Sequence, residues 1–200
     1  MKLYLNKTSP YARLVLVTAH ETELADQLET VWIEPWNDAP ELLAVNPLAK
    51  VPALVTDDGI ALIESSCICD YLITRSRRDD LLPSQPQARA DTLRRLGLGR
   101  AAIDCAFSVV IQRRFNDGAG TILSERWVRA LPRAAAALDG ISGARFGRQQ
   151  PDLGDLAVAV AFAYVDFRLP EIAWRNDAPV LARLVDAVCT RPSMNATRPQ

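Results

Sequence analysis

Residues that usually hold metals are scarce in this chain. Only one histidine, His20, occurs among the 200 residues. The four cysteines (Cys67, Cys69, Cys105 and Cys189) form no C-x-x-C motif. Cys67 and Cys69 would lie on different sides of a helix, which makes them a poor metal-binding pair. We therefore expect no resident metal ion, and we expect the thiols to be reduced and buried.

Long apolar runs and a surplus of one charge are missing too, and the pattern of residues 1–20 does not predict a leader segment. No stretch approaches 18 uninterrupted apolar residues, which excludes a membrane span. Residues 1–20 lack a basic flank, an apolar run and a cleavage site in that order, so we expect a cytoplasmic protein. The formal net charge of −1 argues against nucleic acid as the main partner. With 49% hydrophobic and 24% charged residues, the composition is that of a globular protein and not of a disordered or fibrous chain.

The charge that is present is unevenly distributed. Residues 1–80 hold 7 Lys and Arg against 13 Asp and Glu, a net charge of −6. Residues 81–200 hold 16 against 11, a net charge of +5. An acidic half joined to a basic half suggests two domains that attract each other or that handle different groups.

Alternating and helical patterns in the first part of the chain predict a small mixed sheet covered by helices. Ser9 before Pro10 is a helix-start signal, and Asp57-Asp58-Gly59 is a hairpin signal. The resulting order is β-α-β-(α)-β-β-α, which is typical of an α/β domain. The strands are expected at 2–6, 30–33, 51–55 and 60–63, and the helices at 11–20, 40–45 (short, or a turn) and from Ser65 or Ser66 to 73.

The rest of the chain predicts an all-helical domain. We expect a first domain over 1–76, a linker over 77–86 and a second domain over 87–200, with helices near 87–115, 121–138, 155–167 and 178–189. Asp152, followed three residues later by Asp155, can satisfy the exposed N–H groups of the third of these helices. That helix is apolar on every side and should be central in its domain.

The loop that ends the first strand could stabilise an anion. Ser9 puts a hydroxyl at a helix N-terminus, where the helix dipole favours negative charge. A thiolate bound near Ser9 would gain a hydrogen bond and that field, which lower the pKa of a thiol without a metal or a base. The alternative is that Ser9 is only an N-cap.

Two further loops reach the same end of the predicted sheet. If the Val51–Pro52 bond is cis, the backbone of Val51 is free to pair with an extended peptide ligand, and Lys50 could meet a carboxylate. The alternative is a proline that only shapes the loop. Glu64 could hold an ammonium group, and Ser65 with the backbone N–H groups after it could hold a carboxylate. Simple helix capping is the alternative there.

Taken together, these segments resemble the glutathione S-transferase family. The resemblance rests on Ser-Pro-x-x-Arg at 9–13, Asn-Pro-Leu-Ala-Lys-Val-Pro-Ala-Leu at 46–54 and Glu-Ser-Ser at 64–66. It covers the whole chain and implies a thioredoxin-like N-terminal domain followed by a helical-bundle C-terminal domain. It also implies glutathione as co-substrate, a small electrophile as second substrate, and a homodimer.

The resemblance assigns a role to each matching position. Ser9 would stabilise the glutathione thiolate, with Thr8 as the nearby alternative. Val51, before a cis Pro52, would offer its backbone to the cysteinyl part, and Lys50 would approach the glycine carboxylate. Glu64 and Ser65 would hold the γ-glutamyl end. Neither tyrosine nor cysteine occupies the turn at Thr8 and Ser9, so the resemblance points to a serine-type member. The segments at 164–168 and 191–193 resemble those of a bacterial subgroup of undefined substrate.

The expected activity is conjugation of glutathione to an electrophilic carbon, by positioning and anion stabilisation. Two alternatives stay open. One is a binding or interaction protein with weak or no catalysis, and the other is a glutathione-dependent isomerase or dehalogenase.

Overall fold

The computed structural model describes residues 1–143 and 150–199, which divide into two compact units. The first unit comprises 1–82 and 192–200, and the second comprises 83–191. The last residues therefore group with the first unit, whereas the sequence suggested that they continue the helical domain.

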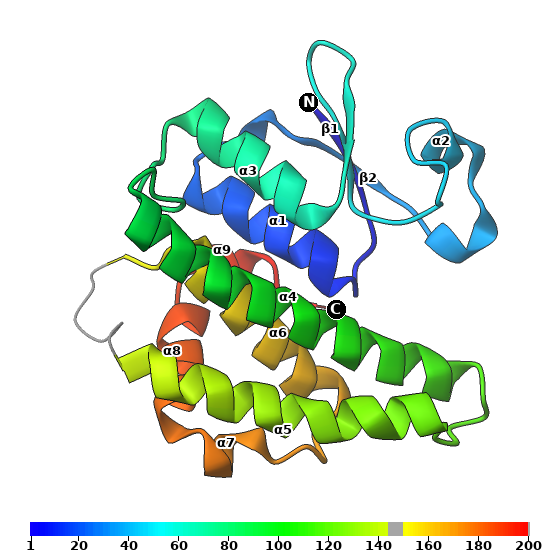
Figure 1. The fold of residues 1–200 in the computed structure, drawn as a ribbon. Helices are drawn as coiled ribbons and strands as arrows, with labels where there is room; N and C mark the ends of the chain where they lie inside the picture. Colours follow the sequence, from blue (N-terminus) through cyan, green and yellow to red (C-terminus); the bar gives the residue numbers. More distant parts are fainter. Residues whose placement is uncertain (144–149, 200) are drawn as a thin grey trace. The chain divides into compact units, whose positions relative to one another are not determined.

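A four-stranded mixed sheet with the order β2-β1-β3-β4 forms the centre of the first unit. β1 is parallel to β2, while β3 is antiparallel to both β1 and β4. α1 and α3 cover one face of the sheet and the short α2 lies on the other (Figure 1). Its elements are β1 (Lys2–Leu5), α1 (Pro10–Glu21), β2 (Glu29–Trp32), α2 (Pro40–Leu43), β3 (Ala53–Val55), β4 (Ala61–Ile63), α3 (Ser65–Ser76) and α9 (Pro192–Ala196).

The alternation of β1 explains why both faces of the sheet are covered. Leu3 and Leu5 point to one face and are fully buried, whereas Tyr4 points to the other face and packs with Leu42 of α2 and Ala53. This arrangement of sheet and helices is the thioredoxin-like fold expected for the N-terminal domain.

The C-terminal helix α9 is attached to α1 through buried polar groups. Arg13 of α1 donates a hydrogen bond to the carbonyl of Met194 (3.3 Å), and the Ser193 hydroxyl donates one to the Glu21 carboxylate (2.5 Å). Both charged side chains of α1 are buried, so these bonds compensate part of their desolvation. A local sequence pattern could not reveal this attachment, because its partners are about 180 residues apart.

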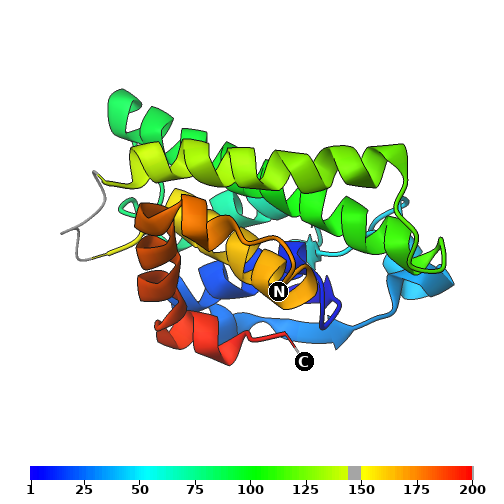
Figure 2. The same cartoon turned by 90° about the horizontal axis from the view of Figure 1, so that it is seen from below.

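The second unit is helical, as expected. It contains α4 (Pro86–Arg114), α5 (Ile122–Ser142), α6 (Leu153–Arg168), α7 (Trp174–Asp177) and α8 (Pro179–Cys189). α4 and α5 run alongside each other (Figure 2), and α6 packs against α4. No helix in the described part of the chain is long and apolar enough to cross a membrane.

The predicted cap of α6 is present and is part of a buried ionic network. The side chains of Asp152 and Asp155 each accept the other residue's backbone N–H. The guanidinium of Arg95, 1% exposed, donates to both oxygens of Asp152 at 2.7 Å and to Asp155 at 2.5 Å. Burial alone would lower the pKa of Arg95, but the hydrogen bonds and charges of the two aspartates raise it.

The close contact between α4 and α6 makes a stability prediction. A Cβ on Gly99 would lie 2.9 Å from backbone atoms of Ala157 and Val158, whereas a Cβ on Gly97 would meet nothing within 4 Å. We expect Gly99→Ala to lower the free energy of unfolding by about 1–3 kcal/mol. The control Gly97→Ala should raise it by about 0.5–1 kcal/mol, because alanine favours a helix. Urea denaturation measures both values, and equal effects would contradict the close contact.

Candidate functional site

The strand register brings the three candidate loops to one end of the sheet. Tyr4 pairs with Ala53, which pairs with Ile63, so the end of β1, the start of β3 and the end of β4 lie side by side. The loops at 6–9, 46–52 and 64–65 leave or enter the sheet there. This convergence is what a site for one extended ligand needs.

Ser9 is the N-cap of α1 and Pro10 is its first residue, as the sequence predicted. The Ser9 side chain accepts the backbone N–H of Ala12 at 3.2 Å. An acceptor bond uses a lone pair of the hydroxyl and leaves its proton available. Among the described residues, no group accepts that proton. Capping and anion stabilisation are therefore compatible in Ser9, because capping uses a lone pair of the hydroxyl oxygen and anion stabilisation uses the hydroxyl proton.

Thr8 differs from Ser9 in this respect. Its hydroxyl donates to Oδ1 of Asn6 at 3.0 Å, and its backbone N–H donates to the same atom at 3.0 Å. The Asn6 amide is held in this orientation because its Nδ2 donates to the carbonyl of Ile33 at 3.4 Å. The proton of Thr8 is thus already used within the loop.

The second loop carries Lys50, Val51 and Pro52. The Val51–Pro52 peptide bond is cis, and the ladder with β1 begins only at Ala53, so the backbone of Val51 lies outside it. The Lys50 side chain is exposed and forms no ion pair within the described residues. The predicted strand over 51–55 is therefore shorter, and its first two residues belong to the loop.

Asn46 organises this loop, a role that was not predicted from the sequence. Its side chain is buried; Nδ2 donates to the carbonyl of Lys50 (2.8 Å) and Oδ1 accepts the N–H of Leu48 (3.1 Å). Asn6 does the corresponding work in the first loop. The available signal was an asparagine at the start of each turn, where its side chain can bond the backbone two residues ahead.

The third loop departs from the sequence prediction. Neither Ser65 nor Ser66 is the N-cap of α3: the helix begins at Ser65, and Glu64 occupies the cap position with a φ of 68°. A non-glycine residue in this left-handed region costs about 1–3 kcal/mol. No side chain caps α3, so the alternative of simple capping by these serines is wrong.

Of the predicted site residues, Ser65 has the feature most typical of a ligand site, a buried polar atom without a hydrogen-bond partner. Its residue is 1% exposed, and its Oγ has no hydrogen-bond partner in the structure. A buried hydroxyl without a partner costs about 1–3 kcal/mol. It lies beside the uncapped N-terminus of α3, whose N–H groups and dipole favour an anion such as a carboxylate.

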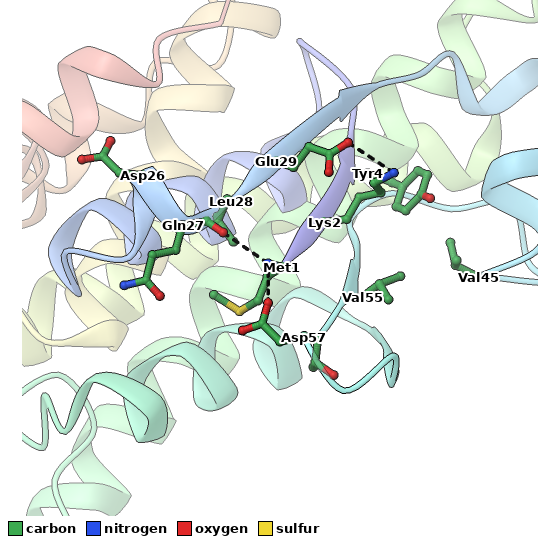
Figure 3. Close-up of a pocket in the computed structure, with 11 residues that line it drawn as sticks. Met1, Lys2, Tyr4, Asp26, Gln27, Leu28, Glu29, Val45, Val55 and Asp57 are labelled. Carbon is green, nitrogen blue, oxygen red and sulfur yellow. Dashed lines mark hydrogen bonds and ion pairs between the residues drawn. The ribbon is translucent and has the colours of Figure 1, made fainter.

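A cavity of about 690 Å³ in the first unit lies away from the three loops. It is at the opposite end of the sheet, around Met1, Lys2, Val55 and Asp57 (Figure 3). Two ion pairs line it, from the terminal ammonium to Asp57 (2.8 Å) and from Lys2 to Glu29 (3.2 Å). None of the predicted site residues lines this cavity. Within the described residues, no group of His, Cys, Asp and Glu is arranged to hold a metal ion.

Comparisons with known proteins identify the family. Residues 8–75 match the model of the glutathione S-transferase N-terminal domain, and residues 122–187 match that of the C-terminal domain. A maleylacetoacetate isomerase of Pseudomonas aeruginosa is 30% identical over 80% of this chain and 76% of its own. The uncharacterized GST-like protein YibF of Escherichia coli is 26% identical over 100% of this chain and 98% of its own.

Solved structures extend the match to the whole chain. A glutathione transferase family member from Pseudomonas fluorescens Pf-5, with bound glutathione, has a TM-score of 0.87 at 32% identity and covers 100% of this chain and 98% of its own. A glutathione S-transferase from Methylobacillus flagellatus KT, with glutathione bound, has the same TM-score at 28% identity, covering 100% and 99%.

The two buried serines of the first unit make a prediction about stability. Ser65→Ala removes a hydroxyl that has no protein partner, so the free energy of unfolding should stay the same or rise by up to about 1 kcal/mol. Ser193→Ala is the control: it removes the donor to Glu21 and should lower that free energy by about 1–3 kcal/mol. Thermal and urea unfolding measure both. A loss in Ser65→Ala as large as in the control would show that the Ser65 hydroxyl is satisfied within the protein.

The matched domain models, the coverage of both halves and the fold lead to one conclusion: this chain belongs to the glutathione S-transferase family.

Proposed function

We propose that this protein binds glutathione at the converged loops, holds its sulfur as a thiolate, and transfers it to an electrophilic small molecule. The observation that carries the proposal is the Ser9 hydroxyl, which caps α1 through its lone pair and keeps its proton for a ligand. Glutathione bound in similar structures supports the choice of co-substrate.

The proposed contacts use each loop once. The thiolate accepts the Ser9 proton, beside the positive end of the α1 dipole. The Val51 backbone pairs with the cysteinyl part, and Lys50 approaches the glycine carboxylate. Ser65 and the first N–H groups of α3 hold the γ-glutamyl carboxylate, while the Glu64 carboxylate holds its ammonium.

Stabilising the thiolate is the chemical step that the protein supplies. An unperturbed thiol has a pKa near 8.5, so only a few per cent is ionised at pH 7. A hydrogen bond to a charged group contributes about 1.5–3 kcal/mol, equivalent to about one to two pKa units. Ser9 is thus sufficient to make a large fraction of bound glutathione reactive at neutral pH.

Ser9 variants test this step through the pH dependence. Without its hydroxyl, the bound thiol should have a pKa about one to two units higher, so turnover at pH 7 should fall about tenfold and should recover as the pH rises above that pKa. Ser9→Gly is preferable to Ser9→Ala, because glycine costs an N-cap only a few tenths of a kcal/mol. Thiolate absorbance and pH–rate profiles are the measurements.

Thr8→Val is the matched control for Ser9. It removes a hydroxyl whose proton is used by Asn6, and it should leave the pKa of bound glutathione unchanged. A shift in Thr8→Val and none in Ser9→Gly would assign thiolate stabilisation to Thr8.

Ser65 and Glu64 variants test the γ-glutamyl contacts. Ser65→Ala and Glu64→Gln should each weaken glutathione binding about tenfold while turnover at saturation changes little, because the lost contacts are the same in the ground and transition states. Calorimetric titration gives the affinity. Normal affinity in both variants would mean that glutathione does not use this end of α3.

Isomerisation is the second candidate, since a maleylacetoacetate isomerase is 30% identical to this chain. In an isomerase, the thiolate adds to the substrate and is released again. Counting glutathione after many turnovers separates the two: conjugation consumes one thiol for each product, and isomerisation consumes none.

A further inference from the structure

The part of the first unit that flanks β2 carries an unusual density of unpaired negative charge. Residues 22–49, here called the acidic segment, contain no Lys or Arg and six carboxylates, all of them exposed. They are Glu23, Asp26, Glu29, Glu34, Asp38 and Glu41. Within the described residues, Glu29 has a weak exposed ion pair with Lys2, whereas Asp26, Glu34, Asp38 and Glu41 have none.

The acidic segment also exposes large aromatic side chains. Trp32 is 52% exposed and Trp36 is 48% exposed. Because Trp32 pairs with Leu5 in the parallel register, it lies on the α1 face of the sheet, at its margin. Exposed indole rings attract Lys and Arg side chains through cation–π interactions, and tryptophan is enriched at binding hot spots.

β2 is an edge strand with backbone groups directed outward. Glu29 and Ile33 donate their N–H groups inward, to the carbonyls of Met1 and Leu5. Strand alternation therefore directs the N–H and C=O groups of Thr30 and Trp32 to the outer edge, where no described strand pairs with them. Figure 2 shows β2, the light blue arrow, at the margin of the first unit.

The cavity beside β1 and β2 adds a place for a basic side chain. Asp26, Glu29 and Asp57 line it, together with Tyr4 and Val55 (Figure 3). Asp57 is already paired with the terminal ammonium and Arg75, which leaves Asp26 and the weakly paired Glu29 as its available carboxylates.

We propose that the open edge of β2, with the acidic segment around it, is a docking surface for a partner protein that presents an extended Lys/Arg-rich segment. The partner's Lys/Arg-rich segment adds a strand to β2 by pairing with Thr30 and Trp32. Its cations meet the carboxylates of the acidic segment, and its side chains contact Trp32 and Trp36. Thr30, Trp32 and the six carboxylates all lie outside the loops at 6–9, 46–52 and 64–65 that are proposed to bind glutathione.

The negative charge of the surface and its open backbone groups favour a basic peptide segment over nucleic acid, a lipid surface, a second copy of this chain or a small amine. Nucleic acids and anionic lipid surfaces would be repelled by six carboxylates. A second copy that paired its own β2 with this one would place two acidic segments against each other, which is unfavourable. A small amine would satisfy the carboxylates but would leave the outward backbone groups without partners.

Fluorescence anisotropy with a labelled ten-residue peptide of alternating Lys and Thr tests the proposal on the full chain. We expect saturable binding that weakens as salt increases, no binding of the matched Glu–Thr peptide, and loss of binding when alternate backbone amides of the Lys–Thr peptide are methylated. Equal binding of the methylated peptide would overturn strand addition, and absence of saturable binding would overturn the surface.

Charge-matched variants separate this surface from general attraction. The triple variant Glu29→Gln, Glu34→Gln, Asp38→Asn should weaken binding about tenfold. The control Asp58→Asn, Asp79→Asn, Asp117→Asn removes the same charge elsewhere and should change binding less than twofold. Trp32→Thr, which keeps a strand-forming residue, should also weaken it. Equal effects of the two triple variants would overturn the assignment.

Sedimentation of the variants tests whether a second copy of this chain occupies the surface. We expect the same oligomeric state in the wild type, the acidic triple variant and Trp32→Thr. Dissociation of a wild-type oligomer by these substitutions would show that the surface is an interface between copies, and would overturn the proposal of a different partner.

Discussion

The register of three short strands is the constraint on which the candidate site depends. β1, β3 and β4 are only three or four residues long, yet the pairing of Tyr4, Ala53 and Ile63 sets which loop ends meet. A slip of one residue would turn Leu3 and Leu5 out of the core, so burial fixes the register strongly. The same burial that stabilises the sheet thus brings the loops that carry Ser9, Val51 and Ser65 to one end of it.

Two local features at this end of the sheet are unfavourable to the folded protein alone. Glu64 adopts a left-handed conformation, and Ser65 keeps a buried hydroxyl without a partner. Structure of this kind persists where the surroundings impose it, and it clusters at ligand sites. Asn6 and Asn46 fix the two neighbouring loops through side chain–backbone bonds.

Features encoded by neighbouring residues were predictable from the sequence. The Ser9 cap before Pro10 and the paired aspartates at the start of α6 depend on residues within one helical turn, and both are present as predicted. Capping of α3 by Ser65 or Ser66 was wrong, because a serine before a helical pattern is typical of an N-cap by its residue type alone. The structure has Glu64 at that position, where the chain turns from β4 into the helix. The role of Asn46 was not predicted, because its partners Lys50 and Leu48 are brought to its side chain only in the folded loop. The attachment of α9 to α1 lay beyond local reasoning altogether, because it joins distant parts of the chain.

The return of α9 to the first unit makes that unit discontinuous: the chain leaves it after residue 82 and re-enters it at residue 192. During synthesis from the N-terminus, α1 is completed long before Ser193 and Met194 emerge. Until then, Arg13 and Glu21 lack the α9 groups that they contact in the finished protein. All four strands of the sheet precede residue 64, but the helix that carries Ser9 at its N-cap reaches its final environment only after Ser193 and Met194 have been synthesised.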